Sequence, residues 1–202
     1  MTAILIANLP EGKSNYLYLA ADRRVTSGDK LISDNNRKIF VRTNGDTTRY
    51  YATSGDVGPT EYIIDKMESY AIQHVQALLF DEPTLKGVRG TFAAFVVEVS
   101  PDGVVAYEAG IYEEDGEPGK AENRMYMELL DLEELKTYPR VLGSGGFHVL
   151  AAFRAISGQE GISTPHADIN DSFKAAAGVI LSINDTVDIH RFKLPKKSIK
   201  KC

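Results

Sequence analysis

The sequence of 202 residues contains one cysteine, Cys202, and no tryptophan. A single thiol cannot form a disulfide within the chain, which is typical of proteins from a reducing compartment such as the cytoplasm. Charged residues interrupt every hydrophobic stretch well before the roughly 20 residues that a membrane-spanning helix needs. The first residues have neither the basic segment nor the cleavage site of a signal peptide. We therefore expect a soluble, cytoplasmic protein that does not bind membranes.

Basic residues are also fewer than acidic ones, with 23 Lys and Arg against 28 Asp and Glu. Nucleic-acid binding needs a clustered positive surface, so this balance argues against nucleic acid as a partner. The hydrophobic fraction of 43% excludes a disordered chain. Because the length suits a single core and no repeat or linker is visible, we predict one domain over residues 1–202.

The spacing of apolar residues predicts more strands than helices. Residues 3–9 are apolar nearly throughout, which indicates a strand buried on both faces. Alternation and turn residues predict further strands at 16–22, 31–33, 38–42, 47–53, 91–99, 104–112 and 187–194. Helical spacing predicts helices at about 59–80, after the glycines near 145, and at about 167–183. Strands and helices come in separate groups, so the pattern favours an α+β protein with antiparallel sheets layered with helices. Residues 113–138 are acidic, and we interpret them as a partly helical insertion.

Three familiar kinds of site are disfavoured. The glycine-rich segment 142–146 lacks the Lys-Ser/Thr of a phosphate loop and the first glycine of a nucleophile elbow. It is typical of a tight turn from a strand into a helix. The histidines lack the spacing of a zinc site.

Four residues form a consistent catalytic set: Thr2, Asp22, Lys38 and Ser144. Removal of Met1 would give Thr2 a free α-amine beside its hydroxyl. An α-amine has an ordinary pKa of about 7.7–8.0, so it can act as the general base for that hydroxyl. A nearby Lys38 would lower the pKa of both groups, and Asp22 would keep the lysine charged and in place.

Four segments carry a resemblance to a known family: TAILIA (2–7), LAADRRVTSGDKLISDNNRKIF (19–40), ATSGDVG (52–58) and LGSGGFHVLAAFRA (142–155). With the 16-residue separation of Asp22 and Lys38, the chain resembles the proteasome β-type and HslV-like peptidases. These are N-terminal nucleophile hydrolases. The resemblance implies a four-layer αββα sandwich with two antiparallel sheets.

The resemblance also implies roles for individual residues. Thr2 would be nucleophile and base, Lys38 would tune it, and Asp22 would orient Lys38. Ser144 and the amide of Gly145 would hold the amine and a water. The substrate oxyanion would bind the amide of Ala52, and an S1 pocket would be lined by Val25, Asn36, Phe40, Tyr50 and Ser54.

The resemblance predicts a threonine-type endopeptidase that needs no cofactor for its chemistry. A structural monovalent cation would bind the carbonyls of Gly178, Leu181 and Asn184. Members of the family form homo-oligomeric rings, and an ATP-driven unfoldase feeds them unfolded polypeptides. Two alternatives stay open. One is a catalytically silent ring or scaffold subunit that binds partners, and the other is a hydrolase of small amides.

Overall fold

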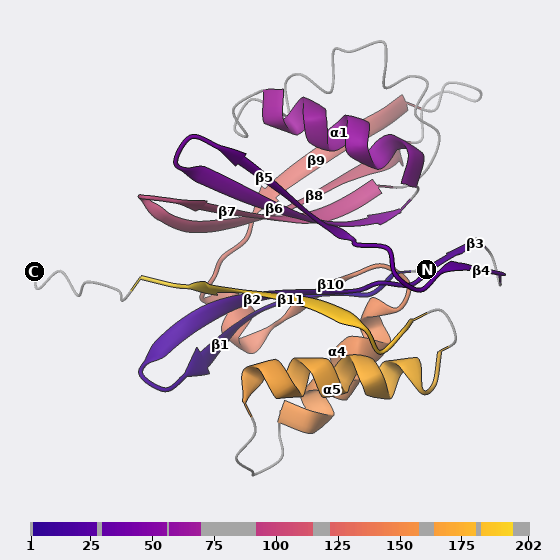
Figure 1. Cartoon of the computed structure of the whole chain (residues 1–202). Coiled ribbons are helices and arrows are strands. Elements are labelled where there is room, and N and C mark those ends of the chain that lie inside the picture. The colour runs from indigo at the N-terminus through magenta and orange to yellow at the C-terminus, as the bar shows by residue number, and fades with distance from the viewer. Residues whose placement is uncertain are drawn as a thin grey trace, which may run out of the picture.

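The computed structural model describes residues 2–27, 30–55, 57–69, 92–114, 122–157, 164–180 and 183–195. Two antiparallel sheets lie face to face, and helices cover their outer surfaces, so the layers run helix, sheet, sheet, helix (Figure 1). The predicted four-layer αββα architecture is confirmed.

The lower sheet of Figure 1 has the strand order β10-β1-β2-β11. Its strands are β1 (Ile4–Glu11), β2 (Ser14–Asp22), β10 (Arg140–Leu142) and β11 (Val187–Lys193). β1 pairs with both β2 and β10, so the residues next to its start have neighbours on each side.

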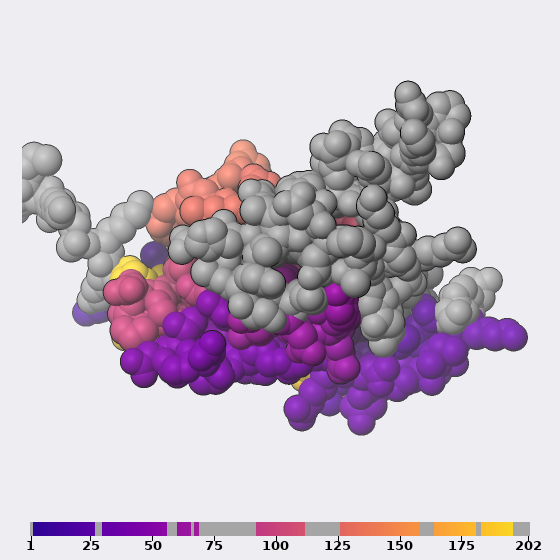
Figure 2. Space-filling view, turned by 90° about the horizontal axis from the view of Figure 1, so that it is seen from above, coloured from indigo at the N-terminus to yellow at the C-terminus, as the bar shows by residue number. Residues whose placement is uncertain are grey.

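The upper sheet has the order β5-β6-β7-β8-β9. Its strands are β5 (Ile39–Asn44), β6 (Thr47–Gly55), β7 (Phe92–Ser100), β8 (Gly103–Glu114) and β9 (Glu122–Leu129). From the α1 side, β5 and β6 lie along one edge and residues of β9 at the opposite edge (Figure 2). A separate hairpin joins β3 (Val25–Ser27) to β4 (Lys30–Ser33).

The helices are α1 (Val57–Ser69), α3 (Glu134–Thr137), α4 (Gly146–Ser157) and α5 (Pro165–Ala177). α1 covers the upper sheet, whereas α4 and α5 cover the lower one (Figure 1). None of the helices in the described part of the chain is long and apolar enough to cross a membrane.

The run of apolar residues in β1 follows from its place between two cores. Ile4 and Ile6 belong to the cluster between the two sheets. Ala3 and Leu5 point the other way and pack with residues of α4 and α5. All four are at most 1% exposed. The predicted strand buried on both faces is therefore confirmed.

Some predicted boundaries differ from the structure. Residues 122–129 form β9, a full member of the upper sheet, so among the described residues of 113–138 the helical prediction holds for Glu134–Thr137 alone. α5 begins at Pro165 because the Thr164 hydroxyl accepts a hydrogen bond from the amide of Ala167. It ends at Ala177, earlier than predicted. The predicted helix at 59–80 is observed as α1, and its second half lies outside the described residues.

Candidate active site

Thr2 lies directly before β1, and hydrogen bonds hold both polar atoms of the peptide unit that joins it to Ala3. The Gly145 amide donates to the Thr2 carbonyl at 3.0 Å. The next amide, that of Ala3, donates to Asp22 Oδ1 at 2.8 Å, and the Asp22 amide donates back to the Ala3 carbonyl at 3.1 Å. Thr2 is thus held between the end of β2 and the turn that joins β10 to α4.

The Asp22 carboxylate also binds Lys38, which reaches it from the start of the other sheet. Lys38 Nζ lies 2.7 Å from Asp22 Oδ1, and the residues are 6% and 0% exposed. Asp22 Oδ2 accepts a third hydrogen bond, from the Arg24 amide at 3.0 Å. Each carboxylate oxygen is therefore bonded, as a buried charge requires.

Burial lowers the pKa of the Lys38 ammonium from its ordinary value, while the charge of Asp22 and the hydrogen bond to it oppose that effect. The lysine consequently releases its proton more readily than an exposed lysine. The ammonium binds the same carboxylate oxygen as the amide that follows Thr2, which places a group able to take part in acid–base chemistry next to that residue.

The turn before α4 depends on a glycine that sequence reasoning did not single out. Gly143 has φ +81°, and a Cβ built on it would lie 2.1 Å from the Thr2 carbonyl oxygen. The same Cβ would lie 3.0 Å from Ser54 Oγ, so the end of β6 also reaches this point. Ser144 is exposed between Gly143 and the buried Gly145. The segment LGSGG contained this signal, because such a turn needs a left-handed residue.

The structure contradicts the predicted role of the Ala52 amide. Ala52 is fully buried inside β6, where it pairs with Ile39 on one side and Phe95 on the other. Alternate residues of a strand direct their amides to opposite neighbours. The Thr53 amide donates to the Lys38 carbonyl at 3.0 Å, so the Ala52 amide points into β7. A substrate oxygen cannot reach it while the sheet is intact.

Gly55, three residues further on, has the orientation that Ala52 lacks. It is the last residue of β6 and lies two positions after Thr53. Amides two positions apart on a strand point to the same side, so the Gly55 amide points to the Lys38 side. β5 begins only at Ile39 and provides no strand partner there. The φ of Gly55, +124°, explains why a glycine stands at the end of β6.

The five residues predicted to line one S1 pocket do not converge. Tyr50 packs in the core between the two sheets, against Phe192 and His190, with ring centroids 4.7 and 5.1 Å away. Phe40 packs on the opposite face of the upper sheet, under α1. The prediction is wrong for this pair, because neighbouring strands placed the two rings on opposite faces.

The three remaining members of that set are Ser54, Val25 and Asn36. Ser54 meets the Gly143 turn, as described above. Val25 is half-buried in β3, and Asn36 is exposed while its amide donates to the Arg23 carbonyl at 3.0 Å. Lining of a substrate pocket by these three residues stays a prediction.

The predicted cation site is only partly within the described residues. Gly178 caps the C-terminal end of α5, and Leu181 lies outside the described residues. The side chain of Asn184 is 5% exposed and binds two other segments of the chain. Among the described residues, no three His, Cys, Asp or Glu side chains cluster as a metal site of those ligands would require.

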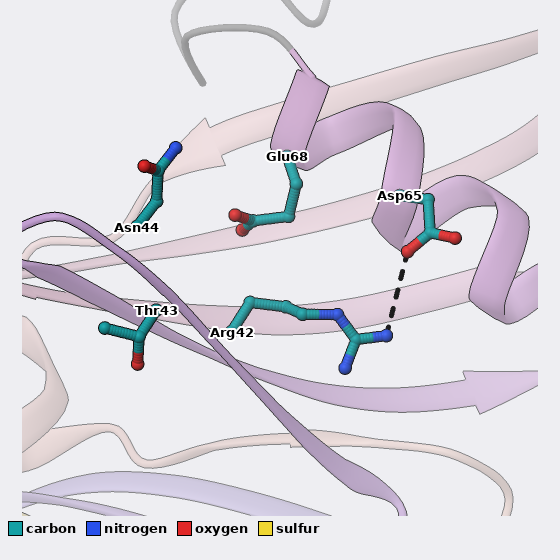
Figure 3. A pocket seen from close by; sticks show the side chains of 5 residues that line it. All are labelled: Arg42, Thr43, Asn44, Asp65 and Glu68. Carbon is teal, nitrogen blue, oxygen red and sulfur yellow. Dashed lines mark ion pairs between the residues drawn. The ribbon is translucent and has the colours of Figure 1, made fainter.

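A cavity of about 460 Å³ lies elsewhere, between the β5–β6 hairpin and α1 (Figure 3). Its lining is polar and charged, and consists of Arg42, Thr43, Asn44, Asp65 and Glu68. It adjoins the opposite end of the hairpin from Ser54. The cavity is therefore separate from the residues around Thr2.

Comparison with known proteins gives structural likeness only. No protein-family profile matches the chain, and no curated protein matches it in sequence. Eukaryotic HslV from Trypanosoma brucei superposes with a TM-score of 0.58 at 16% identity, over 95% of this chain and 99% of that one. Anbu, an ancestral β-subunit, from Yersinia bercovieri gives 0.63 at 15% identity, over 95% of this chain and 81% of that one.

The chain has the fold of HslV and Anbu. A third structure, Thiobacillus denitrificans BPH in complex with epoxomicin, gives a TM-score of 0.58 at 17% identity. That match covers 96% of this chain and 100% of the other. At these identities the likeness establishes the N-terminal nucleophile hydrolase fold, while activity has to be argued from the site.

Proposed function

We propose that the protein is a threonine-type peptidase that uses Thr2, after removal of Met1, as an N-terminal nucleophile. The observation that carries the proposal is the buried chain of contacts from Lys38 through Asp22 to the Ala3 amide. A buried charged pair costs stability unless its geometry is excellent. Here it lies beside the first residue that a processed chain would present.

In the proposed reaction, Thr2 Oγ attacks the carbonyl carbon of a peptide bond and its proton passes to the α-amine. The amine then gives this proton to the departing nitrogen, which leaves an ester on Thr2. A water molecule attacks the ester, the same amine accepts its proton, and Thr2 Oγ recovers a proton as the acid product departs. The positive charge of Lys38, fixed by Asp22, favours the deprotonated hydroxyl and amine.

Two backbone features support this chemistry. The Gly145 amide holds the Thr2 carbonyl, which fixes the direction of the residue. We assign stabilisation of the oxyanion to the Gly55 amide in place of that of Ala52, because only the former points to the Lys38 side of β6. In other hydrolases, loss of one such donor costs about 2.7–4 kcal/mol of transition-state stabilisation. Ser144, exposed beside Gly145, would bind the amine through water.

We further propose a homo-oligomeric ring in the cytoplasm, to which an ATP-driven unfoldase delivers unfolded polypeptides. The fold shared with HslV and Anbu supports this arrangement. A structural monovalent cation at the carbonyls of Gly178, Leu181 and Asn184 belongs to the same proposal.

Intact mass spectrometry with and without a covalent inhibitor of N-terminal threonines, such as epoxomicin, tests processing and reactivity together. We expect a chain that lacks Met1 and gains the mass of one inhibitor molecule. Thr2→Ala should abolish both labelling and cleavage of a fluorogenic peptide. Thr43→Ala, which removes an exposed threonine hydroxyl from β5, is the matched control and should leave both unchanged.

Retention of Met1 in an assembly that cleaves peptides contradicts the proposal, as does unchanged turnover of Thr2→Ala. The second candidate is an assembly subunit without peptidase activity. The likeness to the Pseudomonas aeruginosa Anbu subunit, whose structure is a helical assembly, supports its role in assembly, with a TM-score of 0.54. A processed or unprocessed chain that assembles but neither labels nor cleaves supports that candidate.

A further inference from the structure

The segment that connects Asp22 to Lys38 leaves the lower sheet and returns to the start of the upper one. Its two limbs are joined near their bases, where the Asn36 amide donates to the Arg23 carbonyl at 3.0 Å. Arg23 directly follows Asp22, and Asn36 precedes Lys38 by two residues. The separation of the limbs therefore determines how the carboxylate meets the ammonium.

Asn184, just before β11, binds both limbs with one side chain. Its Oδ1 accepts a hydrogen bond from the Arg23 amide at 3.0 Å, and its Nδ2 donates to the Asp34 carbonyl at 2.8 Å. The two contacts join residues that are 161 and 150 positions apart in the sequence. Only a side chain with a donor and an acceptor of this spacing satisfies both limbs at once, and a carboxylate would lack the donor.

Two further side-chain contacts between the limbs are open to water. Arg24 Nε bonds Asp34 Oδ1 at 2.5 Å, and Arg23 Nη1 bonds Asn35 Oδ1 at 3.1 Å, both at exposed positions. Asn184, in contrast, is 5% exposed. Hydrogen bonds in a dry site hold their geometry better than exposed ones, because water does not compete for the same groups.

We propose that the side chain of Asn184 is a positioning residue for the Asp22–Lys38 pair. By fixing both limbs, it holds the carboxylate and the ammonium at the 2.7 Å separation seen in the structure. This role uses the side-chain amide and is independent of any cation bound at the Asn184 carbonyl. Its consequence for turnover rests on the proposed peptidase function, whereas its consequence for Lys38 does not.

Acylation of Lys38 in the intact protein tests the positioning directly. A water-soluble amine-acylating reagent is applied, and modification of Lys38 is followed by peptide mass spectrometry. Asn184→Ala should raise the rate severalfold because the limb that carries Lys38 is released. Asn184→Asp keeps the size and the acceptor but loses the donor, so it should behave like Asn184→Ala if hydrogen bonding matters. If only packing matters, Asn184→Asp will label at the wild-type rate, which overturns the proposal.

Asn8→Ala is the matched control. Asn8 is also buried, and its Nδ2 donates to a backbone carbonyl, that of Leu132, at 2.7 Å. Its removal tests whether general destabilisation exposes Lys38. Equal labelling of Asn8→Ala and Asn184→Ala overturns the proposal, and wild-type labelling of Asn8→Ala supports it.

Steady-state peptide cleavage then tests the catalytic consequence. Both Asn184 variants should lower kcat by about 10- to 100-fold with little change in KM, as expected when catalytic groups are slightly displaced. Raised labelling with unchanged kcat overturns the role in catalysis. If the wild-type protein neither cleaves nor takes up epoxomicin, the peptidase proposal fails, and the labelling rates still decide whether Asn184 positions Lys38.

Discussion

At the scale of single residues, two of the ion pairs in the described part of the chain differ sharply in burial. Lys38 and Asp22 are 2.7 Å apart with side chains 7% and 0% exposed, whereas Arg42 and Asp65 are 3.7 Å apart and 38% and 70% exposed. Lys38→Met would leave a buried carboxylate without its cation, so we expect a loss of about 3–5 kcal/mol in the free energy of unfolding. Arg42→Met should cost at most about 1 kcal/mol. Urea unfolding measures both, and equal losses would contradict the assignment of Asp22 as a buried charge.

His190 gives a pH dependence whose direction can be worked out. It is half-buried against Tyr50, and this burial lowers its pKa below the ordinary 6.5, partly opposed by Asp188. The unfolded chain therefore binds a proton more readily than the folded one. Its contribution to stability is complete above about pH 6.5 and is lost as the pH falls from there through the folded-state pKa.

Urea midpoints at several pH values above and below that point test this expectation. His190→Phe should make the midpoint fall less steeply on acidification than it does in the wild-type protein. His148→Phe, at an exposed position of α4, is the control and should keep the wild-type slope. A His190→Phe slope equal to that of the wild type contradicts the prediction.

The sequence predicts the positions of site residues at the ends of strands better than it predicts which face of a sheet a residue inside a strand lies on. Asp22 ends β2 and Lys38 precedes β5, so their meeting beside Thr2 could be predicted from strand ends alone. The pocket prediction failed for Phe40 and Tyr50, because the face on which each residue of a hairpin lies depends on the exact register of its strands. Amide direction also alternates along β6, which is why we propose the Gly55 amide as the oxyanion donor in place of the Ala52 amide.

At the scale of elements, the turn from β10 into α4 gives the most specific prediction. Gly143→Ala adds a Cβ that would lie 2.1 Å from the Thr2 carbonyl oxygen. The clash is with backbone atoms, so it can be relieved only by moving the backbone of Thr2 or of the turn. We expect loss of peptide cleavage and of epoxomicin uptake, because Thr2 must move. Gly12→Ala, at φ +59° with no atom within 4 Å, is the matched control. It should cost about 1–2 kcal/mol of stability and leave activity unchanged.

If Gly143→Ala retains wild-type uptake of the inhibitor, the turn does not position Thr2. The two variants must be compared at a temperature where thermal unfolding shows both to be folded. A loss of uptake in folded Gly143→Ala, with Gly12→Ala unaffected, separates displacement of Thr2 from general strain.

Strands were more predictable than the acidic region because their signals are local. β1 and the β7–β8 hairpin follow from continuous apolar or alternating residues joined by a tight turn. β9 was missed because it is an edge strand whose residues, ENRMYMEL, include good helix formers. Its pairing with β8 along the full strand, from Glu122 to Leu129, is a long-range effect that overrides that preference.

At the scale of the whole molecule, the proposed function requires assembly. Several subunits together enclose a chamber, and only unfolded chains can enter it to be cleaved. Light scattering coupled to size exclusion should give a mass that is a multiple of the 22.2 kDa chain. A ring has one fixed multiple that does not grow with concentration, because its contacts close on themselves. An open helical assembly lengthens as the concentration rises.

Thr2→Ala separates assembly from catalysis in this measurement. The substitution removes a half-buried hydroxyl without altering the backbone bonds that Ala3 and Gly145 make around it. We therefore expect the variant to have the wild-type mass and to lack cleavage. A monomer at all concentrations contradicts the ring, and a mass that increases steadily with concentration identifies an open assembly. Electron microscopy of the same fractions shows whether the Thr2 end of each subunit faces an enclosed space, as the delivery of unfolded polypeptides requires.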